Sequence, residues 1–223
     1  MQAINIAVDG PSGAGKSTLA RRLAAKLGYI YVDTGAMYRA IAYHTLRCHA
    51  EDEAAVMELL PVIHVTLKYS DGVQRVLLNG EDVSEVIRTP EVSMAASRVS
   101  AIPAVREHLL GMQRQLAAEQ SVVMDGRDIG TVVLPDAQVK IFLTASAEKR
   151  AERRFLELEQ KQPGVQTYEE VLADVIRRDK QDTEREIAPL RQAEDAVLVD
   201  TTNADLDQSE EMMLAVCREK LGI

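Results

Sequence analysis

A glycine-rich segment near the start of the chain has the residue types that bind nucleotide phosphates. Residues 10–17 read Gly-Pro-Ser-Gly-Ala-Gly-Lys-Ser and match the pattern G-x-x-x-x-G-K-S. Glycines let several backbone N–H groups converge on one phosphate, at the positive end of the helix that follows. In this pattern Lys16 reaches the β- and γ-phosphates and the Ser17 hydroxyl binds Mg²⁺. The predicted site for ATP with Mg²⁺ comprises Gly10, Pro11, Ser12, Gly13, Ala14, Gly15, Lys16, Ser17 and Thr18.

Aspartate and arginine recur at the ends of two predicted strands. Residues 33–39 read Asp-Thr-Gly-Ala-Met-Tyr-Arg, and residues 125–128 read Asp-Gly-Arg-Asp. Ligands of doubly wound sheets bind beside the carboxyl ends of the strands, so we expect both segments to line one cleft. There Arg39 and Arg127 would hold an anion, and Asp125 would hold a Mg²⁺-bound water. The alternative for the two arginines is an ordinary surface ion pair.

Further arginines follow at helical spacing in the last third of the chain. Arg150, Arg153 and Arg154 are spaced i, i+3 and i+4 and therefore share one helix face. Phosphoryl transfer needs donors around the oxygens of the transferred group, and closure of a lid could bring Arg150, Arg154 and Arg178 there. For Arg153 and Arg177 we expect ordinary pairing with acidic residues of the same helix.

Alternating strands and helices would position these residues. Short apolar runs predict five strands, and helical stretches separate them, which is typical of βα units and a parallel sheet. The sequence therefore predicts the α/β class. Pro163-Gly164 separates two further charged helices. The predicted strands are 4–9, 29–32, 121–125, 139–143 and 196–200, and the predicted helices include 18–26, 37–46, 52–60 and 207–220.

One stretch interrupts that alternation. Residues 64–78 read as an antiparallel hairpin closed by Asp71-Gly72, and Asn79-Gly80 forms a second tight turn. Thr89-Pro90 then starts a helix, with threonine as the cap and proline at the first helical position. We expect residues from about 61 to 101 to form a small inserted subdomain.

The composition limits the classes of partner. The chain has 223 residues, 46% of them hydrophobic, which is enough for one large domain with a buried core. Its formal net charge of −9 disfavours nucleic acid and anionic membranes as partners. The longest apolar run, residues 212–217, is far below the ~18 residues of a membrane span, and no secretory signal is visible. With only Cys48 and Cys217 as cysteines, a reducing cytoplasm fits best.

The phosphate-binding segment alone leaves several classes of protein open. A regulatory GTP-binding protein would carry Asn-Lys-x-Asp, but none of Asn5, Asn79 and Asn203 precedes a lysine. An ATPase that handles DNA would usually be larger and would carry a basic face. The remaining class is a small phosphotransferase.

Five motifs in a fixed order resemble those of bacterial cytidylate kinases, and the resemblance spans essentially the whole chain. It implies a P-loop kinase fold in one domain, 1–223, with a five-stranded parallel sheet flanked by helices. An inserted antiparallel hairpin subdomain at about 61–101 would extend the nucleoside monophosphate site, and a helical lid would lie at about 150–168. The motifs are 10–17, 33–39, Val-Arg-Glu at 105–107, 125–128, and Arg-Asp-Lys-Gln-Asp-Thr-Glu-Arg at 178–185, followed by Ala188-Pro189-Leu190.

The resemblance also implies an activity, the transfer of the γ-phosphoryl group of MgATP to CMP or dCMP. By that resemblance Arg39 and Arg127 hold the acceptor phosphate, with Thr34 nearby. The residues implied for CMP are Thr34, Gly35, Tyr38, Arg39, Ser97, Arg106, Arg127, Asp128, Asp182 and Arg185. The residues implied for catalysis are Lys16, Arg127, Arg150, Arg154 and Arg178, and those for the metal are Ser17 and Asp125.

Within that set, Ser97, Arg106 and Asp128 would read the cytosine base, and Asp182 and Arg185 would contact the ribose. Cytosine presents an amino donor beside two acceptors, so a carboxylate and a guanidinium complement it. Uracil would turn an acceptor toward Asp128, and a mismatch of this kind discriminates strongly.

Two other interpretations remain open. A kinase for another acceptor, such as UMP, AMP or shikimate, would share the loop and the lid but lack the pair Arg106 and Asp128. A non-catalytic nucleotide-binding module would bind ATP without turnover and would have little reason to keep an arginine-rich lid. We expect a monomer, because lid closure needs hinge motion and no exposed heptad repeat is evident.

Overall fold

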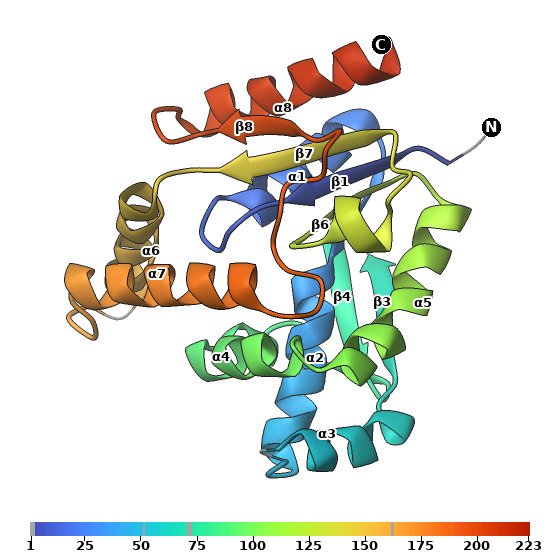
Figure 1. Cartoon of the computed structure of the whole chain (residues 1–223), viewed down its shortest axis with the longest axis vertical. Coiled ribbons are helices and arrows are strands. Elements are labelled where there is room, and N and C mark those ends of the chain that lie inside the picture. The colour runs from blue at the N-terminus through green and yellow to red at the C-terminus, as the bar shows by residue number, and fades with distance from the viewer. Residues whose placement is uncertain (1–2, 51, 71–72, 162) are drawn as a thin grey trace.

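A five-stranded parallel sheet forms the centre of the computed structural model, which describes residues 3–50, 52–70, 73–161 and 163–223 (Figure 1). Its strands are β1 (Asn5–Asp9), β2 (Ile30–Asp33), β6 (Val122–Gly126), β7 (Val139–Thr144) and β8 (Val197–Asp200). They lie in the order β2-β6-β1-β7-β8, and all five predicted strands are confirmed. β2 and β6 lie on one side of β1, and β7 and β8 lie on the other. The strand order therefore reverses at β1, and sheets of this kind bind ligands beside the carboxyl end of the strand at such a reversal.

Helices cover both faces of this sheet. Ile6 lies in the hydrophobic cluster formed with α1 (Lys16–Leu27) and α8 (Leu206–Leu221). The next residue, Ala7, lies in a separate cluster on the opposite face, to which α5 (Pro103–Glu119) contributes. Side chains of a strand alternate between the two faces, so a strand buried on both reads as a continuous apolar run.

A second, smaller unit extends from this layered body (Figure 1). It contains a three-stranded antiparallel sheet where the sequence predicts a two-stranded hairpin. The additional strand follows the turn at Asn79-Gly80, whose φ angles of 50° and 88° are typical of tight hairpin turns. The turn expected at Asp71-Gly72 lies outside the described residues. The unit comprises α2 (Thr34–Arg47), α3 (Glu53–Leu59), β3 (Val65–Ser70), β4 (Val73–Leu78), β5 (Glu81–Asp82) and α4 (Pro90–Val99), with 3₁₀ helices at Leu60–Val62 and Val86–Arg88.

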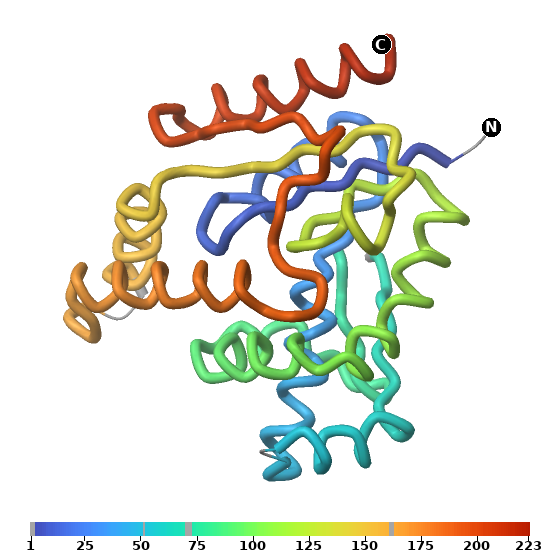
Figure 2. Tube along the Cα trace, in the orientation of Figure 1, coloured from blue at the N-terminus to red at the C-terminus, as the bar shows by residue number. Residues whose placement is uncertain are grey.

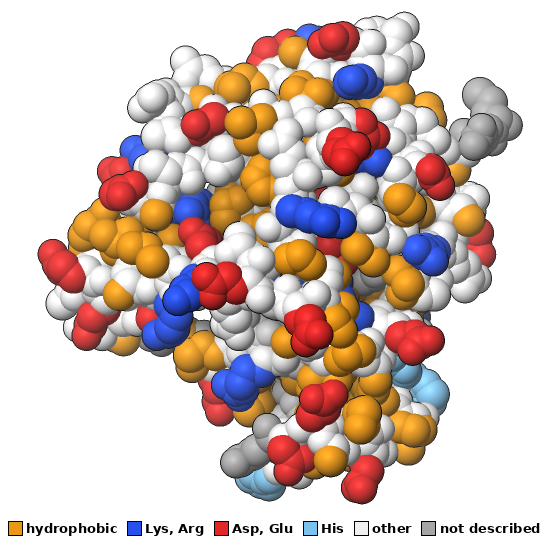
Figure 3. All heavy atoms as spheres, viewed as in Figure 1, with side chains coloured by type: hydrophobic (Ala, Val, Ile, Leu, Met, Phe, Trp, Pro, Cys, Tyr) orange, Lys and Arg blue, Asp and Glu red, His pale blue; other side chains and the backbone are white. Residues whose placement is uncertain are grey.

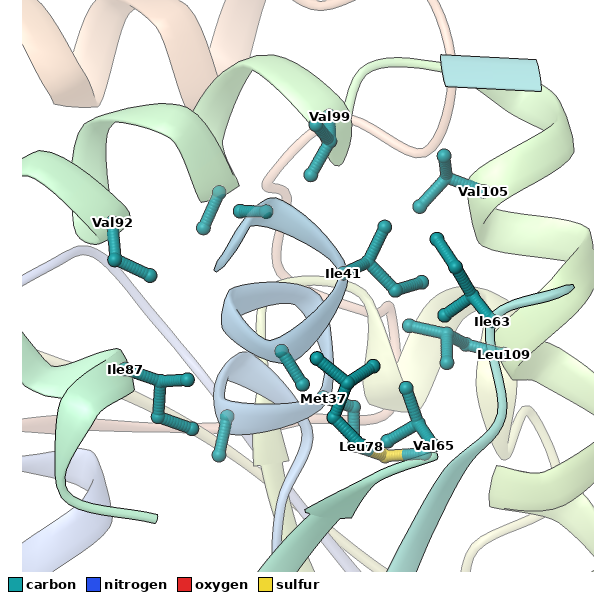
Figure 4. Packing of buried hydrophobic residues seen from close by; sticks show 14 of the residues in the cluster. Met37, Ile41, Ile63, Val65, Leu78, Ile87, Val92, Val99, Val105 and Leu109 are labelled. Carbon is teal, nitrogen blue, oxygen red and sulfur yellow. The ribbon is translucent and has the colours of Figure 1, made fainter. Parts of the chain in front are cut away.

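The smaller unit has its own hydrophobic cluster around α2 (Figure 4). Met37 and Ile41 of this helix are fully buried and contact side chains from the antiparallel sheet, α4 and α5. The Thr89 hydroxyl accepts the N–H of Val92 and caps α4, as the sequence predicts. Because α2 begins directly at the end of β2, this packing fixes the acceptor motif of residues 33–39 relative to the large sheet.

Two helices, α6 (Ala147–Lys161) and α7 (Tyr168–Glu184), pack against each other beyond the carboxyl end of β7, and Figure 2 shows them crossing at a steep angle. The predicted break at Pro163-Gly164 lies between them. Arg177 pairs with Asp174 within α7 at 2.9 Å, which confirms the expectation for this residue. The same expectation is wrong for Arg153, whose guanidinium donates to the carbonyl oxygen of Thr201 at 2.8 Å.

The surface carries charges of both signs. On the face seen in Figure 3, acidic and basic side chains are interspersed, with hydrophobic side chains between them. Within the described residues, every helix is too short or too polar to cross a membrane.

Candidate active site

The glycine-rich loop joins β1 to α1. A Cβ at Gly10 would overlap the carbonyl oxygen of Leu143, and Gly13 and Gly15 have φ angles of 77° and 88°, so the loop depends on glycine. Lys16 folds back so that its Nζ donates to the carbonyl oxygen of Pro11 at 2.7 Å. Burial and the neighbouring Arg127 lower the pKa of Lys16 well below its ordinary value. An anion bound in the loop would stabilise the charged form of Lys16 and so raise its pKa again.

Asp125, at the end of β6, lies directly beside the start of α1. Its Oδ2 accepts the Ser17 hydroxyl at 3.0 Å, and its Oδ1 accepts the hydroxyl of Tyr31 at 2.8 Å. Burial and the adjacent Asp33 raise the pKa of Asp125 to about 6. The carboxylate and the serine hydroxyl are hard oxygen ligands, which fit Mg²⁺. The structure thus brings together the two residues predicted for the metal.

The motif of residues 33–39 is held by hydrogen bonds at the start of α2. Asp33 accepts the N–H of Ala36 at 2.9 Å and pairs with Arg39 at 3.0 Å. A Cβ at Gly35 would lie 3.2 Å from both of those side chains. The Thr34 hydroxyl donates to the carbonyl oxygen of Asp125 at 2.7 Å, which links this motif to the metal-site candidate.

The residues expected to read the base form a buried cluster of charges. Arg106 donates to the carboxylate of Asp128, and Arg185 approaches the other oxygen of Asp128 at 3.6 Å. The ring of Tyr38 lies under the Arg106 guanidinium, 5.6 Å from its carbon. Ser97 is in α4, one turn before Ser100, whose carbonyl oxygen also accepts from Arg106. The structure therefore brings Tyr38, Arg106, Asp128 and Arg185 together.

Arg127 and Asp182 connect the loop after β6 with α7. Nε of Arg127 donates to Oδ2 of Asp182 at 2.7 Å. Burial would raise the pKa of Asp182, but the guanidinium groups of Arg127, Arg178 and Arg185 lower it below its ordinary value. Burial and the nearby Arg127 lower the pKa of Arg178 to about 10. Three guanidinium groups therefore lie around this one carboxylate.

The two arginines predicted from α6 have different environments. Each guanidinium nitrogen of Arg150 donates to the protein: to the carbonyl oxygens of Ala145 and Ser12 and to the Asp179 carboxylate at 2.9 and 2.6 Å. Arg154 is partly exposed and pairs with Glu157 at 3.6 Å. Arg150 therefore ties the glycine-rich loop to α7, while Arg154 remains accessible.

Buried polar atoms without a hydrogen-bond partner gather in this region. The described residues contain seven such side-chain atoms, and four belong to predicted site residues. Buried polar groups are nearly always paired, so side-chain atoms without a hydrogen bond in a candidate site fit a polar ligand. The four are Nε of Arg39, Oγ of Ser97, Nε of Arg178 and Nη2 of Arg185.

Three residues beside the site were assigned no role in the sequence analysis: Asp9, Tyr31 and Asp179. Asp9 accepts the N–H groups of Ile129 and Gly130 at 2.8 and 2.7 Å, at the start of a π-helix (Ile129–Val133) that was not predicted. Burial raises the pKa of Asp9 to about 6. Their partners are distant in sequence; the available signals were the position of Asp9 directly before the glycine-rich loop and that of Asp179 within the motif of residues 178–185.

Comparison with known proteins adds independent information. A family model described as "Cytidylate kinase" matches residues 6–219. The chain is 54% identical to a "Cytidylate kinase" of Syntrophotalea carbinolica over 96% of this chain and 92% of that protein. It is 51% identical to one of Caldicellulosiruptor saccharolyticus over 100% and 99% of the two chains. A solved uncharacterized protein from Eubacterium ventriosum, 14% identical, covers 95% of this chain and 96% of its own with a TM-score of 0.50, a similarity of fold alone.

Proposed function

The chain belongs to the cytidylate kinase family, and on that basis we propose that it transfers the γ-phosphoryl group of MgATP to CMP or dCMP, giving MgADP and CDP or dCDP. One observation carries the proposal beyond the family: four buried polar atoms of predicted site residues lack a hydrogen-bond partner in an acidic protein of net charge −9. Three of the four are guanidinium nitrogens, and guanidinium donors suit a polyanionic ligand, because each phosphate offers several acceptor oxygens.

ATP would bind with its phosphates in the glycine-rich loop. The lowered pKa of Lys16 supports this assignment, since a bound phosphate would offset the burial of its charge. Ser17 and Asp125, joined by a hydrogen bond of 3.0 Å, would hold the divalent cation, which we propose to be Mg²⁺. When bound, the cation neutralises charge on the β- and γ-phosphates. The residues proposed for ATP are Gly10, Pro11, Ser12, Gly13, Ala14, Gly15, Lys16, Ser17 and Thr18.

CMP would bind on the opposite side of the cleft. Arg39 and Arg127 would hold its phosphate, and Asp128 would accept a hydrogen bond from the cytosine amino group. The pairing of Arg106 with Asp128 supports this role, because the guanidinium holds the buried carboxylate in a fixed orientation. The other residues proposed for CMP are Thr34, Gly35, Tyr38, Ser97, Arg106, Asp182 and Arg185.

In the reaction, a phosphate oxygen of CMP attacks the γ-phosphorus of ATP in line. A phosphate monoester is already nucleophilic at neutral pH, so the protein needs no strong general base. Lys16, Arg127 and Arg178 would stabilise charge on the transferred group, with Arg150 and Arg154 on the lid. Closure of the lid at about 150–168 would exclude water, which could otherwise accept the phosphoryl group.

We further propose that the protein is cytoplasmic and monomeric, that it does not bind nucleic acid, and that residues of about 61–101 extend the acceptor site. The net charge of −9 supports the absence of nucleic-acid binding. Sedimentation velocity at micromolar concentration would test the monomeric state, and a dimer mass would contradict it.

A coupled assay of ADP release tests the activity. CMP, dCMP, UMP, AMP and shikimate would be compared as acceptors at equal concentration. We expect kcat/KM for CMP or dCMP to exceed that for the others by about 100-fold or more, because a polar mismatch at Asp128 is costly. Equal use of UMP or AMP, or ATP binding without turnover, would contradict the proposal.

A further inference from the structure

Tyr31 lies in β2, outside the motifs that the sequence singles out, yet its hydroxyl group reaches the candidate active site. The hydroxyl donates to Oδ1 of Asp125 at 2.8 Å, and 7% of the residue's surface is exposed. We propose that Tyr31 is a positioning residue for the divalent cation that accompanies ATP, because it fixes the Asp125 carboxylate beside Ser17. This inference rests on the proposed function of the same site.

The register of the sheet explains why a tyrosine reaches Asp125. In the parallel pairing of β2 with β6, Tyr31 lies opposite Val123 and Asp33 lies opposite Asp125. Side chains two residues apart on a strand share a face, so Tyr31, Val123 and Asp125 all point toward α1. Two strand residues span about 6.6 Å, which is close to the length of a tyrosine side chain. The ring therefore lies along the sheet and delivers its hydroxyl to the carboxylate at the end of β6.

Two donors hold the Asp125 carboxylate, one on each oxygen. Ser17 donates to Oδ2 at 3.0 Å, and within the described residues Tyr31 is the one donor to Oδ1. The backbone is fixed as well, because Thr34 donates to the carbonyl oxygen of Asp125 at 2.7 Å. Without the tyrosine hydroxyl, the carboxylate would keep a single side-chain hydrogen bond and could rotate away from Ser17.

The tyrosine ring itself has a fixed position. It belongs to the buried cluster that includes Val123 and Leu19, and the Arg21 guanidinium lies over it, 5.2 Å from the ring centre. A donor held in this way restrains its acceptor before any ligand binds. Hydrogen bonds to metal-binding carboxylates commonly act like this, and their loss lowers metal affinity.

The test compares binding of a non-hydrolysable ATP analogue by calorimetry, in excess Mg²⁺ and in EDTA. Tyr31→Phe removes the hydroxyl and keeps the ring. Tyr29→Phe, whose ring packs against the same cluster, makes the same chemical change away from Asp125. Asp125→Asn removes the charge that Tyr31 is inferred to orient. Formation of CDP by each variant is measured separately.

We expect Tyr31→Phe to weaken binding about ten-fold with Mg²⁺ and by less than about two-fold in EDTA. Tyr29→Phe should match the wild type in both conditions. Asp125→Asn should bind the analogue no more tightly with Mg²⁺ than in EDTA. Equal losses for Tyr31→Phe with and without Mg²⁺ would mean a packing role and would overturn the inference.

The remaining outcomes separate the inference from the function. If Asp125→Asn loses the Mg²⁺ effect but Tyr31→Phe does not, the positioning role is wrong and the assignment of Asp125 stands. If neither variant alters the Mg²⁺ effect, the inference and the metal role of Asp125 are both wrong. The kinase assignment itself fails only if the wild-type protein forms no CDP.

Discussion

Arg150 and Asp179 form a two-pronged ion pair that joins α6 to α7, with donor–acceptor distances of 2.9 and 2.6 Å. The Arg150 side chain is 5% exposed and that of Asp179 is 26% exposed. The same guanidinium also donates to the carbonyl oxygen of Ser12 in the glycine-rich loop at 3.0 Å. The Arg150 side chain in α6 is therefore bonded both to the glycine-rich loop and to α7.

The first prediction concerns the strength of this connection. Asp179→Asn would leave the buried Arg150 charge without its anionic partner, and we expect the free energy of unfolding to fall by about 1–3 kcal/mol. Urea unfolding monitored by circular dichroism measures the change. Asp174→Asn is the control, because Asp174 pairs with Arg177 in the same helix on an exposed surface, and it should cost less than about 0.5 kcal/mol. Equal costs for the two variants would contradict the prediction.

The second prediction concerns the lysine of the glycine-rich loop. Lys16→Ala should lower kcat by about 10²–10³-fold, because it removes a cation directed at the transferred charge. The far-ultraviolet circular dichroism spectrum should remain that of the wild type. Lys149→Ala provides the control, since Lys149 pairs with Glu152 on the surface. Undiminished turnover by Lys16→Ala would refute the assignment of this loop.

The third prediction concerns base selection by Asp128. Asp128→Asn would replace a pure acceptor with an amide that can also donate, so it should tolerate uracil better. We expect the preference for CMP over UMP in kcat/KM to fall by about ten-fold or more, while the KM for ATP changes little. Asp136→Asn, at an exposed position, should keep the wild-type preference. An intact preference in Asp128→Asn would mean that another residue reads the base.

The fourth prediction concerns the pH dependence of stability. Burial raises the pKa of Asp9 from 3.8 to about 6, so the folded state binds this proton more tightly than the unfolded state. The stabilisation linked to that proton is complete below pH 3.8 and is lost as the pH rises through about 6. A shift of this size corresponds to about 3 kcal/mol.

Asp9→Asn keeps the size of the side chain and removes the titration. The difference in unfolding free energy between the wild type and this variant should therefore change by up to about 3 kcal/mol between pH 4 and pH 7, with the wild type losing relative stability. Urea titrations at both pH values measure it. A constant difference across this range would show that Asp9 has an ordinary pKa.

Features set by local sequence were predictable. The five strands are short apolar runs because their sheet is buried on both faces, and the cap at Thr89 depends on its own helix alone. The glycine-rich loop needs a fixed pattern of consecutive residues, so its position was also correct. The two-residue strand Glu81–Asp82 was missed because it is exposed and has no apolar alternation.

Contacts between distant segments were not predictable in the same way. The partner of Asp9 is 120 residues away, and Tyr31 and Asp125 are 94 residues apart. Sequence spacing fixes which face a side chain takes, but the identity of its neighbour depends on strand order and register. The resemblance to a family assigned roles to residues within motifs. Asp9 and Tyr31 lie outside those motifs, so neither was assigned a role.

The pairing of three guanidinium groups of the candidate site with three different carboxylates has a further consequence. Arg39 is matched by Asp33, Arg106 by Asp128 and Arg127 by Asp182. Any incoming anion must compete with carboxylates that are already in contact and cannot diffuse away. A small anion that meets a single guanidinium would therefore displace at most one of these carboxylates, whereas a ligand with several anionic oxygens could engage more than one pair at once. We expect selectivity against small anions to arise from this built-in competition.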